Sequence, residues 1–387
     1  MLSTFYLFQL WIIHVLAERK LEFVQVMYRH GDRAPLVYPY PKDYYTSEYW
    51  PRGWGGITNL GLQQSYELGK FFRSRYIESG FVAEIHNQSE VLIRASELDR
   101  TIISTQAILY AMYPVRKNPA FQWNPEIDWQ PIPFYTTNIK TPDLDTIPSN
   151  IACPRQIGLF EKFNETCALH YGRKYEKLFA YLSKVTGWDN FSYFHVDRIY
   201  DVQREVMNGL LEHQPDWVFK RWPEYENKTT LEIFLPMRHL KYHAPFADFE
   251  SAKATTGVTL KRWIDRALNV TRSSKSKVSP KLILFGSNDW TMYSLLRSFE
   301  LHNYLLVPYC AALIMEVYSN DNGEYDFEIL YRNDTSVPPY SLKIPNCEMP
   351  CPVRKLPILY ANSTLNNIEE MYEYCGSPPP KCFKEGR

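Results

Sequence analysis

The sequence predicts an α/β fold, and the main evidence is a repeated alternation of short apolar runs with helical patterns. Three runs are typical of buried strands, namely Leu21–Met27, Val91–Ile93 and Leu282–Phe285. Polar residues follow each run at once, and apolar residues at helical spacing come next. Because strand–helix alternation builds a sheet covered by helices, we expect a mixed, mainly parallel sheet flanked by helices.

Apolar residues three and four positions apart mark three helices that accompany these strands. Thr58 is suited to cap the first helix, because its hydroxyl can accept a hydrogen bond from the first turn. The apolar faces consist of Leu62, Tyr66, Gly69, Phe72 and Tyr76, then Ile102, Ile103, Ala107, Ile108 and Tyr110, and finally Met292, Leu295, Leu296 and Phe299.

Residues 131–253 interrupt this alternation. The stretch is rich in Pro, Trp and charged residues and has no comparable strand pattern. We expect it to form a mainly helical insertion that covers the sheet. The α/β domain is therefore predicted to comprise residues 18–130 and 254–376, with a polar tail at 377–387.

Residues 1–17 have the features of a signal peptide. They are largely apolar and end in Val15, Leu16 and Ala17, and short side chains at the last and third-last positions suit signal peptidase. An uncleaved anchor is the alternative, but the run is shorter than the roughly 20 residues that a membrane span needs. No later segment is apolar enough to cross a membrane. We expect a secreted product, with the lysosomal lumen as the alternative location.

The composition agrees with the secretory route. The 387 residues carry 43 basic and 43 acidic side chains, and this balance argues against a nucleic-acid partner. The seven cysteines show no metal-type Cys-x-x-Cys spacing, so we expect disulfides, with at least one thiol left unpaired within the chain. Sequons for N-glycosylation begin at Asn87, Asn164, Asn190, Asn227, Asn269, Asn333 and Asn362.

Polar residues gather where the predicted strands end. Ligands of open α/β sheets bind at the carboxyl ends of the strands, so residues there are expected to form one site. A histidine between two arginines, in the string YRHGDRAP that begins at Tyr28, is suited to a pocket that holds an anion. The residues at the three strand ends are Arg29, His30 and Arg33, then Arg94, and then Asn288 and Asp289.

These residue types permit phosphoryl transfer. A neutral imidazole such as that of His30 can attack phosphorus and form a phosphohistidine. The three arginines would hold the non-bridging oxygens, and their positive field would keep the imidazole neutral. Asp289 would protonate the leaving alkoxide and then activate water. Such a scheme needs no metal and no other cofactor.

Simpler explanations exist for individual residues. Arg94 would form a surface salt bridge, and Asp289 would cap a helix. His239 and His243 stand four residues apart, as metal ligands on one helix face do, but the sequence offers no third ligand nearby. The chain has no Gly-x-Ser-x-Gly elbow and no phosphate-binding Gly-rich loop with Lys, which disfavours a serine hydrolase and a P-loop NTPase.

Further motifs extend the pattern over nearly the whole chain. They are RHGDR from Arg29, GLQQ from Gly61, LG from Leu68, RSRY from Arg73, Arg94 with DRT from Asp99, WQPIP from Trp129, CPR from Cys153, YRNDT from Tyr331, and Cys347 with Cys351. With these motifs the chain resembles the histidine acid phosphatases, the branch of the histidine phosphatase superfamily that includes the prostatic and lysosomal enzymes. The resemblance implies a phosphoglycerate mutase-like fold with a smaller helical domain, small phosphate monoesters as substrates, and a homodimer.

The resemblance also assigns roles. It implies that His30 is the nucleophile, that Asp289 is the proton donor, and that phosphate is bound by Arg29, Arg33 and Arg94. Because Asp289 must be protonated while His30 is neutral, we expect activity to fall as the pH rises above about 6.

Two disulfides are implied by the same resemblance. They join Cys153 to Cys375 and Cys347 to Cys351. A third family bridge has no clear counterpart, because no cysteine lies near Arg204. The partners of Cys167, Cys310 and Cys382 are left open.

One position departs from the family pattern. The family has His-Asp after the third strand, where this chain has Asn288 and Asp289. An amide can donate a hydrogen bond to phosphate but carries no charge, and charged hydrogen bonds are worth ~1.5–3 kcal/mol against ~1 for neutral ones. We expect catalysis to be weakened by about tenfold to a few hundredfold. The alternative is a catalytically impaired secreted protein that binds phosphate esters or a protein partner.

Overall fold

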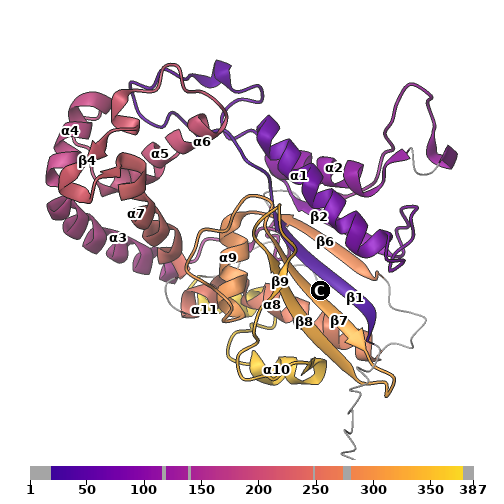
Figure 1. Ribbon diagram of the computed structural model, residues 1–387. Coiled ribbons are helices and arrows are strands. Elements are labelled where there is room, and N and C mark those ends of the chain that lie inside the picture. The colour runs from indigo at the N-terminus through magenta and orange to yellow at the C-terminus, as the bar shows by residue number, and fades with distance from the viewer. Residues whose placement is uncertain (1–18, 116–118, 138–140, 247–248, 273–279, 378–387) are drawn as a thin grey trace, which may run out of the picture.

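The computed structural model describes residues 19–115, 119–137, 141–246, 249–272 and 280–377. The predicted signal peptide and Cys382 lie outside these residues. The chain forms two lobes, a larger one around a central sheet and a smaller one made of helices (Figure 1). None of the helices in the described part of the chain is long and apolar enough to span a membrane.

The sheet is mixed, with the strand order β10-β8-β7-β1-β6-β2-β3 and β9 paired to β8. Its parallel half comprises β1 (Lys20–Arg29), β6 (Leu282–Ser287), β2 (Val91–Ser96) and β3 (Tyr135–Thr137). Its antiparallel part comprises β7 (Ala312–Ser319), β8 (Tyr325–Arg332), β9 (Tyr340–Ser341) and β10 (Cys351–Pro352). The predicted α/β class is confirmed, and the three predicted strands are the adjacent parallel strands β1, β6 and β2.

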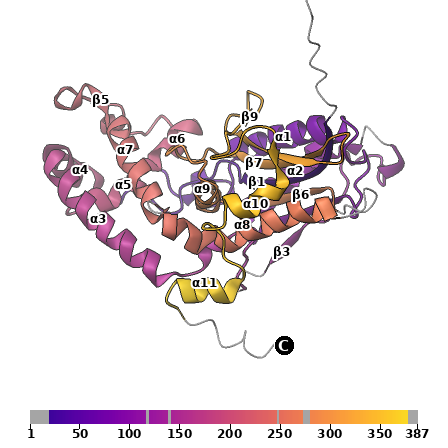
Figure 2. The same cartoon turned by 90° about the horizontal axis from the view of Figure 1, so that it is seen from below.

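Helices cover both faces of the sheet (Figures 1 and 2). α1 (Asn59–Phe72) and α2 (Asp99–Met112) lie on one face, and α8 (Phe249–Arg272) and α9 (Asp289–Ser298) lie on the other. As the sequence predicts, the Thr58 hydroxyl caps α1 by accepting a hydrogen bond from the Gly61 amide. All three predicted helices are present, as α1, α2 and α9.

Strand β1 lies in the middle of the sheet and is almost completely buried. Its side chains alternate between the faces, so that Val24 and Val26 pack with α1 and α2, whereas Phe23 and Met27 pack with α8 and α9. Burial on both faces explains why β1 is continuously apolar in the sequence. The same alternation decides on which side each functional residue emerges at the end of a strand.

The smaller lobe has its own hydrophobic core and consists mainly of helices, as expected (Figure 1). The predicted boundaries at 131 and 253 are wrong, however, because β3 belongs to the sheet and α8 runs across the second boundary. β3 has three residues at the sheet edge, which is too short for a strand pattern. The helices of the lobe are α3 (Pro154–Lys174), α4 (Glu176–Thr186), α5 (Val196–Tyr200), α6 (Val202–Met207) and α7 (Thr230–His243), joined by the hairpin β4 (Arg221–Trp222) and β5 (Lys228–Thr229).

Both disulfides implied by the resemblance are formed in the structure. Cys153, just before α3, is bonded to Cys375, which ends α11 (Ile368–Tyr374). Cys347 is bonded to Cys351 in the loop that leads to α10 (Leu356–Leu359). Among the cysteines that the structure describes, Cys167 and Cys310 are free thiols, the first half-buried and the second buried.

Candidate functional site

The segment after β1 is held tightly by its neighbours. The His30 amide donates to the Ser287 carbonyl at the end of β6 (3.2 Å), and the Gly31 amide donates to the Ser104 hydroxyl on α2 (3.0 Å). A Cβ on Gly31 would lie 2.1 Å from the Gly61 carbonyl oxygen, so glycine alone permits this close approach of the segment to α1. The backbone thus fixes where the His30 ring lies.

His30 is buried at 2% exposure, and both of its ring nitrogens have partners. Nδ1 lies 2.8 Å from the Gly31 carbonyl oxygen, which can only accept, so this nitrogen carries the proton. Nε2 therefore has a lone pair, and it accepts a hydrogen bond from Arg100 Nε (3.1 Å). Burial first, and then Arg29 and Arg100, hold the pKa of His30 well below its ordinary value. The ring is neutral and presents a nucleophilic nitrogen.

Arg29 forms one wall of the site. Its guanidinium pairs with the Asp289 carboxylate (2.6 Å), donates to the Val307 carbonyl (2.5 Å) and stacks on the Tyr309 ring (3.8 Å to the centroid). Asp289 is the first residue of α9 and lies two residues after the end of β6. The ends of β1 and β6 thus bring a cation and a carboxylate together beside His30.

The helical lobe supplies the opposite wall. Asp201, between α5 and α6, pairs with Arg33 (3.2 Å), and Arg238 on α7 pairs with Asp197 (2.5 Å). A cavity of about 50 Å³ lies between the two lobes. It is lined by Arg29, Arg33, Tyr200, Asp201, Arg204, Arg238, Tyr242, Asp289, Leu306 and Tyr309. Four arginines and two carboxylates around a small cavity form a site for a small anion.

Asp32 links the two lobes beneath this cavity. Its carboxylate is fully buried and accepts hydrogen bonds from Thr58 (2.8 Å) at the start of α1, and from Arg204 (2.8 Å) and Asn208 (2.9 Å) at α6. The Arg204 guanidinium also lies over the Tyr309 ring, 5.0 Å from its centroid. Asp32 therefore ties the segment that carries His30 to the helical lobe.

The structure does not bring Arg94 to this site. Arg94 precedes the end of β2 by two residues. Its neighbour Ile93 packs with α1 and α2, and side chains alternate along a strand, so Arg94 lies on the face covered by α8. Its guanidinium pairs with Asp145 (2.7 Å) and Asp143 (3.5 Å). The expectation that Arg94 joins Arg29 and Arg33 is corrected, since this side chain belongs to a separate ion-pair cluster.

Arg100, rather than Arg94, is the third arginine beside His30. It lies in the first turn of α2, and Arg33, Arg29, Asp289 and Tyr309 all act on its pKa, which burial lowers first. The motif from Asp99 to Thr101 contains it, but no role was assigned to it there. A cation in the first turn of a helix opposes the helix dipole, and this was an available signal that Arg100 serves another purpose.

Arg204, Arg238, Asp201 and Tyr309 were also missed by the sequence analysis. Three of them lie in the insertion, far in sequence from the strand ends, and no local pattern sets them apart from other charged residues there. Only the docking of the helical lobe on the sheet places them at the cavity.

Asn288 lies next to the site as a helix cap. Its side-chain oxygen accepts a hydrogen bond from the Thr291 amide (2.8 Å) and so begins α9. Only the NH₂ group of the amide is left to donate to a ligand. Asp289 is not the cap residue, so the simpler explanation offered for it applies to its neighbour instead.

Burial pushes the pKa of the Asp289 carboxyl up, but the charges of Arg29, Arg238 and Arg33 outweigh burial and hold it below its ordinary value. The carboxyl is therefore ionised at neutral pH while the site holds no anion.

The structure shows no metal site around His239 and His243. Their ring centroids are 6.1 Å apart, and the Nε2 atom of His243 lies 2.5 Å from the Tyr304 carbonyl oxygen. Within the described residues, no group of three His, Cys, Asp or Glu side chains is placed to hold a metal ion.

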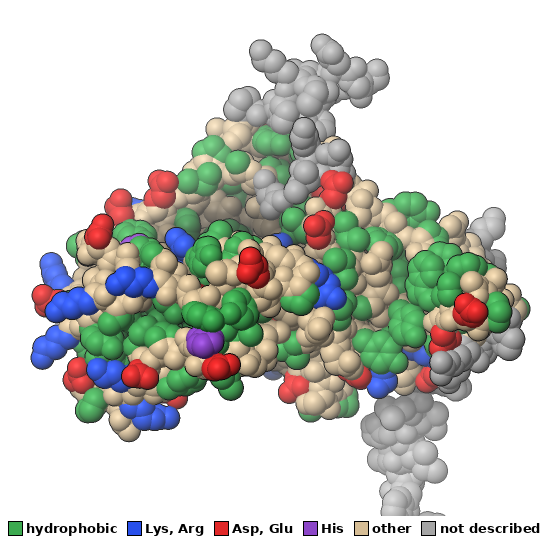
Figure 3. All heavy atoms as spheres, turned by 90° about the horizontal axis from the view of Figure 1, so that it is seen from above, with side chains coloured by type: hydrophobic (Ala, Val, Ile, Leu, Met, Phe, Trp, Pro, Cys, Tyr) green, Lys and Arg blue, Asp and Glu red, His purple; other side chains and the backbone are tan. Residues whose placement is uncertain are grey.

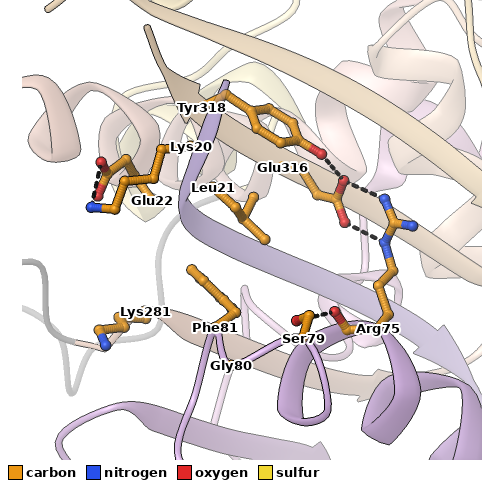
Figure 4. Close-up of a pocket in the computed structure, with 10 residues that line it drawn as sticks. All are labelled: Lys20, Leu21, Glu22, Arg75, Ser79, Gly80, Phe81, Lys281, Glu316 and Tyr318. Atoms are coloured by element: carbon orange, nitrogen blue, oxygen red, sulfur yellow. Dashed lines mark hydrogen bonds and ion pairs between the residues drawn. The ribbon is translucent and has the colours of Figure 1, made fainter. Parts of the chain in front are cut away.

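A second, larger cleft of about 660 Å³ opens at the other end of β1 (Figure 4). Its charged side chains are all in ion pairs, Glu316 with Arg75 (2.6 Å), Lys20 with Glu22 (3.0 Å) and Lys281 with Glu90 outside the lining (2.8 Å). The cleft is lined by Lys20, Leu21, Glu22, Arg75, Ser79, Gly80, Phe81, Lys281, Glu316 and Tyr318, and none of these is a histidine or cysteine. The chemistry of the site at His30 has no counterpart there.

Most of the predicted glycosylation sites lie on the surface. Asn87, Asn190, Asn227, Asn269 and Asn362 are exposed, and Asn333 is half-buried. Asn164 is an exception, because it lies on α3 with 8% exposure. A side chain this buried has no room for a glycan, so the structure removes Asn164 from the candidates.

A neutral imidazole set among arginines, at the carboxyl end of a parallel strand, is typical of α/β proteins that bind phosphate groups. The model of the histidine phosphatase superfamily (branch 2) matches residues 20–332, and the chain belongs to this superfamily. The chain is 31% identical to the lysosomal acid phosphatase of Homo sapiens over 343 residues, which cover 87% of this chain and 76% of that protein. It is 30% identical to the prostatic acid phosphatase of Bos taurus over 348 residues, which cover 89% and 85%.

Solved structures of the same fold include bacterial phytases. The phytase of Klebsiella sp. ASR1 matches with a TM-score of 0.66 and 13% identity over 94% of this chain and 98% of that one. The apo phytase of Hafnia alvei matches with a TM-score of 0.64 and 16% identity over 92% and 98%. At these identities the likeness establishes the fold and carries no conclusion about substrate.

Proposed function

We propose that this protein is an acid phosphatase that hydrolyses phosphate monoesters through a phosphohistidine at His30. The observation that carries the proposal is the fixed tautomer of His30, whose Nε2 lone pair faces the Arg100 guanidinium. Acid phosphatases among the relatives support the same chemistry. A buried neutral imidazole beside several arginines has little purpose in packing but suits attack on an anionic phosphoryl group.

The reaction takes two steps. In the first, His30 Nε2 forms a bond to phosphorus, the bond from phosphorus to the ester oxygen breaks, and Asp289 gives its proton to the leaving oxygen. In the second, water attacks phosphorus, Asp289 takes up the proton of the water, and the phosphorus–nitrogen bond breaks to release phosphate. Arg29, Arg33 and Arg100 bind the non-bridging oxygens throughout.

Substrate binding itself prepares the acid. In the empty site Arg29 and its neighbours lower the pKa of Asp289. A bound phosphate dianion takes over these arginines and adds negative charge beside the carboxyl, which raises the pKa of Asp289. Protonation is then favoured at acidic pH, so the rate is expected to fall as the pH rises above about 6.

Asn288 is expected to reduce the rate without abolishing it. Its oxygen is used to cap α9, and its NH₂ group offers a neutral hydrogen bond where a histidine would offer a charged one. The cost is about tenfold to a few hundredfold in rate.

Secretion is part of the proposal. It is supported by the two disulfides and by the exposed sequons, which suit an oxidising, glycosylating compartment. Basic and acidic side chains are intermixed on the face at the carboxyl ends of the parallel strands (Figure 3), which suits a small substrate better than a nucleic acid. Homodimer formation stays a prediction.

The test is hydrolysis of phenyl phosphate and 4-nitrophenyl phosphate between pH 3 and 8. We expect His30→Ala to remove turnover and Asn288→His to raise it. Asp289→Asn should lose more activity on phenyl phosphate, whose leaving group needs the proton more. Denaturation after brief reaction with labelled substrate should trap label on the protein in an acid-labile, base-stable form.

A second candidate function follows from Asn288. If wild type turns over no faster than His30→Ala, while inorganic phosphate still raises its melting temperature, the protein is a phosphate-ester binder and the proposal of catalysis is wrong. Folding of each variant is checked by its melting temperature without ligand.

A further inference from the structure

Asp43 and Glu205 bring two carboxyl groups together inside the helical lobe. Glu205 lies on α6 and is fully buried, and Asp43, in the long segment between β1 and α1, is 9% exposed. The two carboxyl groups are within hydrogen-bonding contact of each other. Such a contact requires a proton, because two carboxylates offer four acceptors and no donor.

The other hydrogen bonds of the two carboxyl groups also indicate a shared proton. One oxygen of Asp43 accepts from the Tyr45 amide (3.1 Å), and one oxygen of Glu205 accepts from the Gln214 side chain (2.7 Å). The Tyr40 hydroxyl also donates to Asp43, whereas Glu205 Oε1 is buried without a donor among the described protein groups. A single proton between the two carboxyl groups lets one donate to the other and removes one of the two buried charges.

The groups that face the pair are neutral hydrogen-bond donors and one further carboxylate rather than cations. Tyr40 and Tyr45 face it from the segment before α1, Asp201 from the turn between α5 and α6, and Gln214 with the nearby His213 from the loop after α6. Arg204 is the next residue along the chain, but its guanidinium is directed to Asp32. Burial first, and then the facing carboxyl, raise the pKa of Glu205, and burial also raises the pKa of Asp43.

Glu205 lies on α6 among the residues through which the helical lobe contacts the site. Arg204 and Asn208, on either side of Glu205, both donate to the Asp32 carboxylate. Asp201, at the start of α6, pairs with Arg33. Any movement of α6 therefore displaces the lobe side of the cavity. The segment that carries Asp43 leads directly from Arg33 to α1.

We infer that the Asp43–Glu205 pair is a proton-dependent latch that positions α6 against the catalytic segment and releases it as the pH rises. Its effect on turnover rests on the proposed function, whereas its effect on stability does not. The sign follows from the direction of the titration. A carboxyl kept protonated by folding contributes stability that is present below its ordinary pKa of 4.5 and is lost as the pH rises from there.

The experiment measures melting temperature from pH 4 to 8 for wild type, Glu205→Gln and Asp43→Asn. Each variant replaces one carboxyl by an amide of the same shape that donates permanently to the other. Glu212→Gln, which changes an exposed glutamate nearby, is the matched control. We expect wild type and control to lose melting temperature together as the pH rises, and both latch variants to lose at least ~4 °C less between pH 5 and 8.

Hydrogen exchange of the α6 amides, compared between proteins at pH 8, gives the local readout. We expect at least about threefold slower exchange in Glu205→Gln than in wild type. If turnover is measurable, the ratio of kcat/KM of Glu205→Gln to that of wild type should rise with pH. Parallel melting curves for wild type and both latch variants, with unchanged α6 exchange, would overturn the inference. The phosphatase proposal has a separate test: it is contradicted if wild type turns over no faster than His30→Ala, whatever the melting curves show.

Discussion

Two short contacts set the tautomer of the His30 ring. The Nδ1–H group donates to the Gly31 carbonyl oxygen, and Nε2 accepts from Arg100 Nε. Neither partner of the ring belongs to β1, the strand that His30 follows. The first comes from the adjacent residue, and the second comes from the helix that returns along the sheet. The proposed reaction therefore depends on Arg100, because this is the arginine that reaches the His30 ring.

Arg100 and Arg94 make a matched pair for testing this point. Arg100→Ala should lower kcat/KM by about 100-fold, because it removes a charged donor from the transferring phosphoryl group. Arg94→Ala should leave kcat/KM within about threefold of wild type and lower the melting temperature by a few degrees instead. Steady-state kinetics with an aryl phosphate and thermal unfolding distinguish the two. A larger kinetic loss in Arg94→Ala would contradict the placement of Arg94.

The residues of the site were predictable to different degrees for a physical reason. Arg29 ends a buried strand, and His30, Arg33 and Asp289 lie within four residues after one, so their positions follow from strand ends alone. Arg94 also follows an apolar run, but β2 continues past it, and the alternation of side chains puts it on the face covered by α8. To predict whether such a side chain reaches the site, the end of the strand must be known to within one residue. Sequence patterns do not reach that accuracy.

At the scale of elements, Arg94 has a structural role. It shares the buried Asp145 with Arg262 and Arg266 on α8, at 2.7, 2.9 and 2.6 Å. The loop that carries Asp145 also contacts the end of β6 and α9, since Ser287 donates to the Thr146 carbonyl and Ser149 lies 3.1 Å from Thr291. This ion-pair cluster therefore supports the element that begins with Asn288 and Asp289.

Asp145→Asn should destabilise the protein in a pH-dependent way. Burial raises the pKa of Asp145, but the three arginines lower it further than burial raises it, so the net shift is downward. A lowered carboxyl pKa contributes stability above the ordinary value of 3.8 and loses it as the pH falls below that value. We expect a loss of about 2–3 kcal/mol at pH 6 and a flatter pH dependence below pH 4, measured by urea unfolding. An unchanged slope below pH 4 would argue against this cluster as a source of acid sensitivity.

At the scale of the whole molecule, the site lies between two lobes that are far apart in sequence. Asp32 joins them through Arg204 and Asn208, and Arg33 joins them through Asp201. The disulfide between Cys153 and Cys375 ties the start of the helical lobe to the end of the chain, across 222 residues. These links hold the cavity walls in place from opposite ends.

The two disulfides should differ in what they contribute. Closing a loop of 222 residues stabilises by about 5 kcal/mol in the chain-entropy model, against about 2 kcal/mol for the four-residue separation of Cys347 and Cys351. Replacing Cys153 and Cys375 together by Ser should thus lower the urea midpoint more than replacing Cys347 and Cys351. Activity at 25 °C should survive in both, because neither pair touches the cavity. An equal loss in the two double variants would contradict the entropic account.

Sequence patterns alone predict the parallel strands, the helices that follow them and the residues at the strand ends. These features depend on local periodicity and on burial of strands from both faces, which leave a direct record in the order of residues. The tertiary structure alone decided that Arg100 reaches His30, that Arg94 does not, and that Arg204, Arg238 and Tyr309 line the cavity. Those outcomes depend on how elements pack across the sheet and between lobes. Packing depends on residues distant in the chain, so no local pattern encodes it.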